Sequence, residues 1–551
     1  MKYPKNELAQ LIIASCVSCD IEDVVISPGS RNAPLIIGFT SHPKINTYSV
    51  VDERCAAFVA LGMSQQIKKP VVLVCTSGSA LLNYYPAISE AFYSDIPLVV
   101  ISADRPDYLI DIGDGQTIRQ KNVFENHSLY NANLVSGAFL DNEQVLKTAL
   151  LTSVNQNGPV HINVPFDEPL YETVDTILEL KPIINLRNTT AMDADFLQGY
   201  ADIWNDASQK IVLVGTHPPD ILLQTQLVHL AKDPSVLIFT ETTSNLRHQN
   251  FINHIDRLIF TLEDKEFEDL KPTILISLGG LVVSKKIKQF LRKHSPKHHW
   301  HIHPKKEMDT FHCMTEHFKM TPQLFFGQFL SLTSTTKSLY QKNWLDLGSE
   351  RKQRHANFLS KVPFSDLKVH DILFTSLPEN IDLQLANSSI IRYSQLFDLS
   401  SSLSVFCNRG TSGIEGSTST AIGSAMASEK QTLFITGDIS FFYDSNAFWN
   451  SYIPKSFRMV LINNKGGGIF KVIPGPSEST ASNYFETPHG LSAVHICKMF
   501  GIAYQVAYDE SQLITCLEDF YKMSDHPKLI EVYTPSELND SILKAYFNNF
   551  K

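Results

Sequence analysis

The sequence is 551 residues long, and at roughly 150 residues per domain it has room for three or four domains, each with a sizeable core. Its formal net charge of −10 argues against a nucleic-acid partner or an acidic membrane surface, so a small anionic ligand would need local clusters of arginine and lysine. No apolar run approaches the ~18 residues of a membrane span, so we expect no transmembrane segment.

An apolar segment near the start of the chain ends at Cys16 and looks like a lipoprotein cleavage box. Acidic Glu7 precedes it and its apolar residues keep helical spacing, which predicts an amphipathic first helix instead. The eight cysteines are scattered, and Cys16-x-x-Cys19 has no second pair that could complete a metal site. We therefore expect a cytoplasmic protein and no metal at this pair.

Residues 1–180 alternate helix-length patterns with short β-rich runs. The predicted strands are 24–27, 47–50, 71–76, 98–102 and 160–164. This alternation is typical of an α/β fold with a doubly wound parallel sheet. In such sheets ligands bind at the carboxyl ends of the strands, and this chain places polar, glycine-bearing corners there.

The first of these corners is Ser27-Pro-Gly-Ser-Arg-Asn-Ala-Pro34. Ser30 and Asn32 can cap a helix that begins near Pro34, and a helix amino terminus with Arg31 beside it favours a carboxylate or a phosphate. The alternative is a plain capped turn with a solvated arginine.

At the second corner, Glu53 enters a helix of small residues from the end of a strand. A carboxylate in that position can be buried among apolar groups, which raises its pKa and suits it to share a proton. The alternative is a structural glutamate in the first helical turn. The pattern alone leaves both interpretations open.

A third region lies between residues 76 and 120. Thr76-Ser-Gly-Ser79 ends a strand in the same way as Thr436-Gly-Asp-Ile-Ser440 does later, which indicates that the first and last parts of the chain are related folds. Arg105 follows a buried strand at its carboxyl end, so we expect it at the ligand edge of the sheet rather than in the core.

Prolines and charged residues after position 165 indicate a linker to a middle domain at 190–335. Its predicted strands are 210–215, 236–240, 274–278 and 300–303. His299, His301 and His303 share one face of the last strand, a pattern that suggests a metal site. No acidic or cysteine ligand accompanies them at useful spacing, so we expect a half-exposed edge or surface strand.

A charged, mostly helical stretch at 336–365 leads into a third domain at 355–551. There the apolar run 433–436 predicts a short buried strand, after which Gly437 breaks the pattern and Asp438 stands at the carboxyl end. A second predicted strand, 459–462, ends in two asparagines, a lysine and three glycines.

Asp438, Asn464 and a glycine carbonyl such as that of Gly466 would give a hard cation three oxygen ligands, and water and diphosphate oxygens would complete an octahedron. The glycines would let the backbone approach the phosphates closely. The alternative is a strand end that carries a chance Asp-Asn pair.

This Gly-Asp pair, followed about two dozen residues later by Asn-Asn, resembles the metal and diphosphate signature of thiamine diphosphate enzymes. A narrower resemblance rests on SPGSRNAPL, DERCAAFVALG, TSGSA, SADRP and GQTIRQ in the first third of the chain, and on ANSSIIR, NRGTSGIEG, GDIS and NNKGGGIF in the last third. Together these motifs resemble the menaquinone-pathway synthases that make 2-succinyl-5-enolpyruvyl-6-hydroxy-3-cyclohexene-1-carboxylate.

The resemblance implies three doubly wound α/β domains, of which the first binds the aminopyrimidine and the third binds the diphosphate of thiamine diphosphate, together with Mg²⁺ or Mn²⁺. In this superfamily the two domains that complete one site come from different subunits, which implies a homodimer or a homotetramer. The implied cofactor residues are Ser30, Glu53, Thr76, Gly78, Asn83, Ser412, Gly413, Ile414, Gly437, Asp438, Ile439, Ser440, Asn464, Gly466, Gly467, Gly468, Ile469 and Phe470. The implied metal ligands are Asp438, Asn464 and Gly466.

The resemblance also implies the chemistry: 2-oxoglutarate is decarboxylated and the resulting succinyl-semialdehyde carbanion equivalent adds to isochorismate, with Glu53 activating the cofactor. Both substrates are dicarboxylates, which fits basic residues at the motif positions of an acidic chain. The implied catalytic and substrate-binding residues are Arg31, Glu53, Arg105, Gln116, Lys285, Ser388, Arg392 and Arg409. Lys286 stands where the family more usually has arginine.

Two other interpretations remain open at this point. A related thiamine diphosphate decarboxylase or acetohydroxyacid-type synthase would use a smaller 2-oxo acid, but such an enzyme needs at most one carboxylate clamp and this chain offers several arginines. A regulatory or structural homologue would keep only the fold, against which the intact Glu53, Asp438 and Asn464 weigh.

Overall fold

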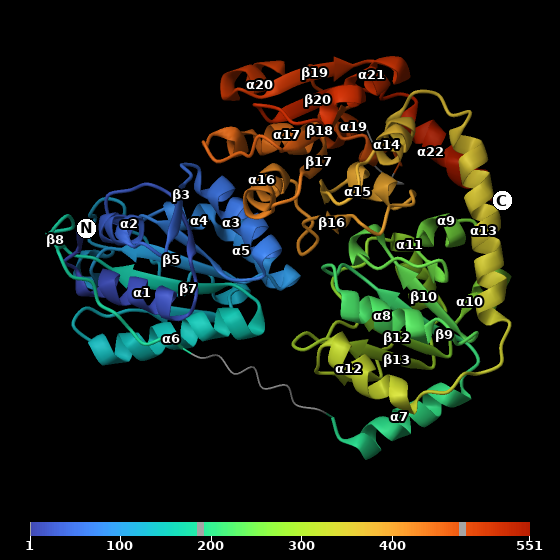
Figure 1. Ribbon diagram of the computed structural model, residues 1–551, viewed down its shortest axis with the longest axis horizontal. Helices are drawn as coiled ribbons and strands as arrows, with labels where there is room; N and C mark the ends of the chain where they lie inside the picture. The colour runs from blue at the N-terminus through green and yellow to red at the C-terminus, as the bar shows by residue number, and fades with distance from the viewer. Residues whose placement is uncertain (1, 184–191, 473–480) are drawn as a thin grey trace.

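The computed structural model describes residues 2–183, 192–472 and 481–551, which form three α/β domains (Figure 1). Each domain is built on one six-stranded sheet in which all neighbouring strands are parallel. The predicted fold class is therefore confirmed. In the part of the chain that the structure describes, no helix has both the length and the apolar composition needed to cross a membrane.

The sheet of the first domain has the strand order β3-β2-β4-β5-β7-β6. Its strands are β2 (Asp23–Ile26), β3 (Asn46–Ser49), β4 (Val71–Cys75), β5 (Leu98–Asp104), β6 (Tyr130–Asn133) and β7 (Val160–Pro165). Its α-helices are α1 (Glu7–Ser18), α2 (Ala33–Ser41), α3 (Glu53–Ile67), α4 (Ala80–Asn83), α5 (Tyr85–Ser94) and α6 (Phe139–Gln156). β4 and β5 are buried along their whole length, which explains their continuous apolar sequences.

The third domain repeats this topology with the strand order β16-β15-β17-β18-β20-β19. Its strands are β15 (Asp382–Leu385), β16 (Ser404–Phe406), β17 (Thr432–Gly437), β18 (Arg458–Asn463), β19 (Ala503–Ala507) and β20 (Lys528–Tyr533). Its helices are α14 (Asp366–Thr375), α15 (Ser389–Ser394), α16 (Ser417–Ala427), α17 (Asp438–Tyr443), α18 (Ile469–Val472), α19 (Ser482–Glu486), α20 (Val494–Phe500), α21 (Glu510–Phe520) and α22 (Asn539–Asn548). The first and third domains are thus related folds.

The middle domain has a different strand order, β11-β10-β9-β12-β13-β14, which is the order of nucleotide-binding doubly wound sheets. Its strands are β9 (Lys210–Val214), β10 (Val236–Thr240), β11 (Phe251–Ile252), β12 (Ile274–Leu278), β13 (His298–Ile302) and β14 (Glu316–Phe318). Its α-helices are α7 (Ala194–Asp206), α8 (Ile221–Leu230), α9 (Ile255–Ile259), α10 (Asp264–Leu270), α11 (Lys285–Lys293) and α12 (Pro322–Phe329).

Two further elements complete the chain. β1 (Tyr3–Pro4) pairs with β8 (Thr173–Val174) in an antiparallel ribbon, so the start of the chain is fixed to the end of the first domain. The predicted charged helix is α13 (Tyr340–Leu359), which runs along the outer side of the molecule from the middle to the third domain (Figure 1). We propose 1–180, 190–335 and 355–551 as the domain boundaries, because each range holds one of the three sheets.

The histidine-rich strand β13 is not the half-exposed edge or surface strand that its composition predicts. β13 pairs with β12 on one side and β14 on the other, so it is an interior strand. His299, His301 and His303 are all buried. The prediction was wrong because these polar rings have hydrogen-bond partners inside the protein. Ser277 on β12 bonds to His299 and His301, and Asp95 of the first domain bonds to His303.

The first and third domains are held together where α3 crosses α16, and two glycines make that crossing possible. A Cβ atom on Gly62 of α3 would lie 2.0 Å from the carbonyl oxygen of Thr420, and one on Gly423 of α16 would lie 2.0 Å from that of Val59. Because both obstacles are backbone atoms, neither can move aside without moving a helix. The small-residue pattern of α3 therefore serves a close contact between two domains.

We expect Gly62→Ala to lower the midpoint of thermal unfolding, since an added methyl group in a packed contact costs about 1–3 kcal/mol or more. Gly199→Ala is the matched control, because Gly199 also lies within a helix, α7, and a Cβ there would meet no atom within 4 Å. That control should leave the midpoint unchanged or raise it, since alanine is the better helix former. Equal midpoints for the two variants would show that the crossing tolerates separation.

Candidate active site

The first group of predicted site residues surrounds the start of α3. Asp52 is the N-cap of this helix and accepts a hydrogen bond from the Cys55 amide, so Glu53 stands in the first turn, directly after β3. Oε2 of Glu53 accepts a bond of 3.5 Å from the side-chain amide of Asn83. Partial burial raises the pKa of Glu53 above its ordinary value. This is the direction expected of a carboxyl group that shares a proton.

The next residues lie at the carboxyl ends of β4 and β5. The Gly78 amide donates to the side chain of Gln120 at 2.8 Å, and the Gln116 carbonyl lies 3.3 Å from where a Cβ of Gly78 would stand. Arg105 Nε donates to the Gly115 carbonyl at 2.7 Å. The structure therefore brings the predicted residues Gly78, Arg105 and Gln116 to one edge of the sheet.

Arg31 and Asn32 differ from the simplest expectation for their corner. Asn32 occupies the N-cap position of α2, but its side chain makes no capping hydrogen bond; its side-chain amide instead donates to the Ser27 carbonyl at 2.9 Å. The predicted cap was therefore wrong. Arg31 is not solvated, because it is 8% exposed and donates to the Phe166 carbonyl at 3.0 Å. Its backbone amide lies 3.3 Å from Thr76 Oγ1, which ties this corner to the end of β4.

The second group of predicted residues lies in the third domain, at the carboxyl ends of β17 and β18. Oδ1 of Asp438 accepts from the Ile439 amide at 2.7 Å, and its Oδ2 accepts from the Gly466 amide at 2.9 Å. Burial raises the pKa of Asp438, and nearby His489, 3.3 Å away, opposes that shift. The chain thus places a buried carboxylate against the glycine run, as the sequence predicts.

Asn464 supplies the observation that tests this corner as a cation site. Its Nδ2 donates to Oδ2 of Asp366 at 3.0 Å, which fixes the orientation of the amide. Its Oδ1 is buried and has no hydrogen-bond partner within the described residues. A buried oxygen without a partner costs free energy, and a cation would remove that cost. The oxygen atoms that this corner offers as metal ligands therefore fit Mg²⁺ or Mn²⁺.

Gly467 and Phe470 close the glycine run. The Gly467 amide donates to the Glu486 carbonyl, and the Phe470 amide donates back to the Gly467 carbonyl at 3.1 Å, so the run turns directly into α18. The backbone of Gly468 and Ile469 follows the same turn, whereas the side chain of Ile469 lies outside the described residues.

Hydrogen bonds connect this corner to the loop at 412–414 and to the predicted basic residues. Ser440 Oγ donates to the Ile414 carbonyl at 3.0 Å, and the side-chain amide of Asn387 donates to the Gly413 carbonyl at 2.7 Å. Oδ1 of Asn387 accepts from Arg409 Nη1, also at 2.7 Å. Asn387 therefore links Arg409 to the loop at 412–414, and that loop contacts Ser440 at the cation corner.

Several site positions have a left-handed backbone although none of them is glycine. Gln116 has a φ of 54°, Ser388 of 68° and Ser412 of 65°. Such conformations cost roughly 1–3 kcal/mol each and persist only where the surrounding structure imposes them. Their occurrence at three predicted positions supports a functional role for these turns.

A cluster of cations forms around Arg409 from two domains. Arg392 on α15 and Lys288 on α11 each lie close enough to Arg409 for its charge to lower their pKa, and Lys285 and Arg292 have the same effect on Lys288. Burial lowers the pKa of Lys288, the carboxylate of Glu241 opposes that shift, and repulsion from nearby cations, Arg409 first, lowers the pKa further. Such a cluster in a chain of net charge −10 is suited to hold carboxylates.

The aminopyrimidine residues and the diphosphate residues lie on different domains, although the start of α3 contacts the end of α17: Arg54 donates to the Tyr443 carbonyl at 3.0 Å and Asp52 accepts from Asn446 at 2.9 Å. Among the residues that the structure describes, no hydrogen bond joins Glu53, Asn83 or Gln116 to the corner at 437–440 and 464–470. Each group lies at the carboxyl edge of its own sheet.

The sequence does not point to three residues that the structure places at this site. Asp366 orients Asn464 from 98 residues away, and His489 lies beside Asp438. Lys288 belongs to the cation cluster and lies one turn after Lys285. The i, i+3 spacing of these two lysines is a signal that could have indicated Lys288.

Two family models of thiamine pyrophosphate enzymes match the chain: the N-terminal TPP binding domain at residues 6–128 and the middle domain at residues 198–385. The crystal structure of benzoylformate decarboxylase from Polynucleobacter necessarius is similar over 96% of this chain and 98% of that chain, with a TM-score of 0.72. At 14% sequence identity that likeness shows the fold alone. The fold and the family models define a thiamine diphosphate-dependent enzyme.

The most informative relatives are proteins named 2-succinyl-5-enolpyruvyl-6-hydroxy-3-cyclohexene-1-carboxylate synthase. The chain is 52% identical to that of Flavobacterium psychrophilum over 100% of both chains, 52% to that of Flavobacterium johnsoniae over 99% of both, and 36% to that of Bacteroides fragilis over 100% of both. The chain therefore belongs to the 2-succinyl-5-enolpyruvyl-6-hydroxy-3-cyclohexene-1-carboxylate synthase family. This confirms the predicted family and favours it over a decarboxylase or acetohydroxyacid-type synthase.

We expect Asp438→Asn to weaken Mg²⁺-dependent binding of thiamine diphosphate at least about tenfold, which corresponds to roughly 1.4 kcal/mol, because the cation loses a charged ligand. Titration of the cofactor with and without Mg²⁺, followed by calorimetry, measures the effect. Asp519→Asn, which changes an exposed aspartate of the same domain, is the control and should bind as the unaltered protein does. Undiminished binding by Asp438→Asn would remove Asp438 from the cation site.

Proposed function

We propose that this protein decarboxylates 2-oxoglutarate and adds the resulting four-carbon unit to isochorismate, giving 2-succinyl-5-enolpyruvyl-6-hydroxy-3-cyclohexene-1-carboxylate for menaquinone synthesis. The observation that carries the proposal is the cation cluster of Arg392, Arg409, Lys285 and Lys288, which Asn387 connects to the loop at 412–414. Both substrates are dicarboxylates, and several guanidinium and ammonium groups suit two such substrates better than one small 2-oxo acid.

Glu53 is proposed to hold the proton that activates the cofactor. When bound, thiamine diphosphate supplies a nucleophilic carbon and accepts the electrons released by decarboxylation. The Glu53 carboxyl group, with its raised pKa, would share a proton with the aminopyrimidine ring, and Asn83 would keep its side chain oriented. Thr76, Gly78 and Gln116 would line the same side of the site.

The third domain is proposed to hold the diphosphate through a divalent cation. Asp438 and Asn464 would ligate Mg²⁺ or Mn²⁺, and the carbonyl of Gly466 would be the third protein ligand. The loop at 412–414, the amides that follow Asp438 and the glycine run would surround the phosphates. Arg31, Arg105 and Ser388 would contact the substrates from either side.

Two copies of the chain are proposed to build each site. The two groups of site residues lie at the edges of different sheets, and among the described residues no hydrogen bond joins Glu53, Asn83 or Gln116 to the Asp438 corner, so the first domain of one copy would face the third domain of another. We also propose that the enzyme acts in the cytoplasm. All eight cysteines lie in the described part of the chain and all are free, as is usual in a reducing compartment.

Glu53→Gln should reduce turnover by about 10²–10⁴-fold, because the amide keeps the size and a hydrogen bond but cannot share the proton. Steady-state rates and cofactor affinity should be measured together, since the affinity should change little. Glu7→Gln is the matched control: Glu7 is also in the first turn of its helix, α1, and that variant should keep full activity. Near-native turnover of Glu53→Gln would return Glu53 to a structural role.

Alanine in place of Arg105, Arg392 or Arg409 should raise the KM of one substrate far more than that of the other, since each charge-assisted contact contributes roughly 1.5–3 kcal/mol. Lysine at the same positions should restore only part of the loss, because an ammonium group lacks the two-pronged guanidinium geometry. Kinetics with 2-oxoglutarate and isochorismate varied in turn assign each residue.

Arg354→Ala is the control for these variants, because Arg354 lies on α13, apart from the cluster, where it pairs with Glu350 and donates to the Lys551 carbonyl at 2.7 Å. Its constants should match those of the unaltered enzyme. Native constants in all three test variants, or turnover of pyruvate in preference to 2-oxoglutarate, would contradict the proposed substrates.

A further inference from the structure

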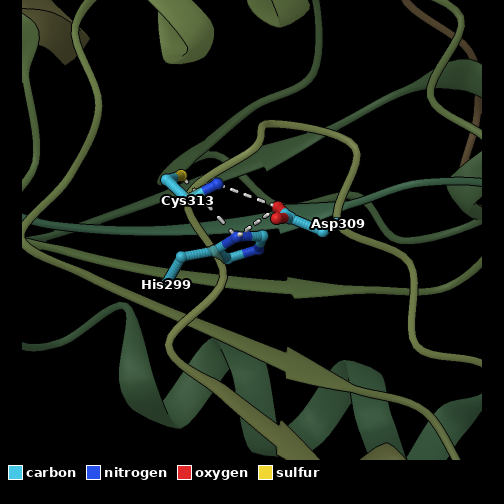
Figure 2. Close-up of side chains that lie close together, drawn as sticks. All are labelled: His299, Asp309 and Cys313. Carbon is cyan, nitrogen blue, oxygen red and sulfur yellow. Dashed lines mark hydrogen bonds and ion pairs between the residues drawn. The ribbon is translucent and has the colours of Figure 1, made fainter.

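A second cluster of metal-ligating side chains lies in the middle domain, apart from the cation corner of the third domain. His299 on β13 faces Asp309 and Cys313, which come from the loop between β13 and β14 (Figure 2). Nδ1 of His299 is 3.8 Å from Oδ1 of Asp309 and 3.8 Å from Sγ of Cys313. All three ligand atoms lie within 4.8 Å of one another.

Backbone hydrogen bonds within the loop hold these side chains in place and leave lone pairs on them that could bind a metal ion. Oδ1 of Asp309 accepts from the amides of Cys313 and Met314 at 3.0 and 3.1 Å, which closes a tight turn. Thr315 bonds to both the amide and the carbonyl of His299 and so fixes the turn against β13. The carboxylate therefore faces the imidazole because of the backbone, not because of an ion pair.

His299 is fully buried, and its ring is oriented by Ser277 on β12. Ser277 Oγ lies 2.8 Å from Nε2 of His299 and 2.9 Å from Nδ1 of His301. The hydroxyl can accept from His299 while it donates to His301, and this arrangement leaves a lone pair on Nδ1 of His299. Metal-binding histidines in proteins are oriented in the same way, through a hydrogen bond from the other ring nitrogen.

We propose that His299, Asp309 and Cys313 bind a zinc-like transition metal ion, with the fourth position open to solvent. Nitrogen, oxygen and thiolate ligands on tetrahedral zinc, with bonds of ~2.1 to ~2.3 Å, lie about 3.4–3.6 Å from one another. The observed separations are a few tenths of an ångström longer between His299 and each partner, and the Asp309 and Cys313 ligand atoms lie within 4.8 Å of each other, so the loop would move inward to close the site. Cys313 would release its thiol proton to solvent on binding.

The position of the cluster gives the metal a structural consequence. The same loop reaches the first domain, where His303 Nε2 lies 3.0 Å from Oδ2 of Asp95 and Lys306 Nζ donates to the Phe92 carbonyl at 2.8 Å. An ion at the base of this loop would fix the segment that joins the middle domain to the first. The inference is independent of the substrates proposed above.

The full-length protein, treated with a chelator and then supplied with excess Mg²⁺ and thiamine diphosphate, should bind one further Co²⁺ per chain. A thiolate-to-cobalt charge-transfer band should appear, because Cys313 is the ligand; the Asp438 corner contains no thiol and cannot produce it. Zn²⁺ should displace the Co²⁺, so that the band disappears. Bound Zn²⁺ should also protect Cys313 from alkylation, as measured by mass spectrometry.

Three variants decide the outcome. Cys313→Ser should lose the band, and Ser277→Ala should weaken Co²⁺ binding roughly 10–100-fold by releasing the imidazole from its orienting bond. Cys19→Ser is the control, because Cys19 is the other partly exposed cysteine, and it should keep the band. A band that survives in Cys313→Ser, or no band and no protection of Cys313 in the unaltered protein, would overturn the proposal.

Discussion

The close crossing of α3 and α16 is the contact on which the arrangement of the molecule depends. One continuous hydrophobic core surrounds it, and that core includes Phe58 and Leu73 of the first domain together with Ile422 and Phe434 of the third. The middle sheet, in contrast, has its own core on each face. The first and third domains therefore share one interior, although some 200 residues of the chain lie between them.

Buried carboxylates fix loops near the site by accepting hydrogen bonds from backbone amides. Glu90 on α5 is 1% exposed, and its two oxygens accept from the amides of Gly410 and Thr411 at 2.7 and 2.6 Å. In the middle domain Glu241 holds the amides of Val283 and Ser284 at 2.7 Å, directly before α11. Each carboxylate fixes a loop that precedes or carries the basic residues of the site, and Glu241 also lies close enough to Arg409 and Lys288 to interact with their charges.

Much of the fold follows from local sequence. β4, β9 and β17 are buried apolar runs that end in glycine or polar residues, and such runs predict parallel strands directly. β6 reads YNAN and β14 reads EHF, and neither edge strand has an apolar run to reveal it. Edge strands depend on their neighbours for pairing, which their own residues do not show.

The site residues likewise divide into those that the local sequence predicts and those that it does not. Asp438 and Asn464 were predictable because each follows a strand at the carboxyl edge of one sheet, so the topology alone brings them together. Asp366, which orients Asn464, and Asp309, which meets His299, depend on how distant segments or a loop fold back. Short motifs identify a ligand edge, whereas the groups that orient its residues come from anywhere in the chain.

The shared interior also has a consequence for synthesis of the protein on the ribosome. α3 ends at Ile67 and its partner α16 ends at Ala427, so the apolar face of α3 must wait for some 360 further residues before it can be covered. At about 5–20 residues per second that delay lasts on the order of 20–70 s. During this interval the nascent first domain exposes the helix face that later packs against α16. The order of the domains along the chain thus leaves this apolar face without its partner until the third domain is being synthesised, and it sets the earliest moment at which the packing of the first domain can be completed.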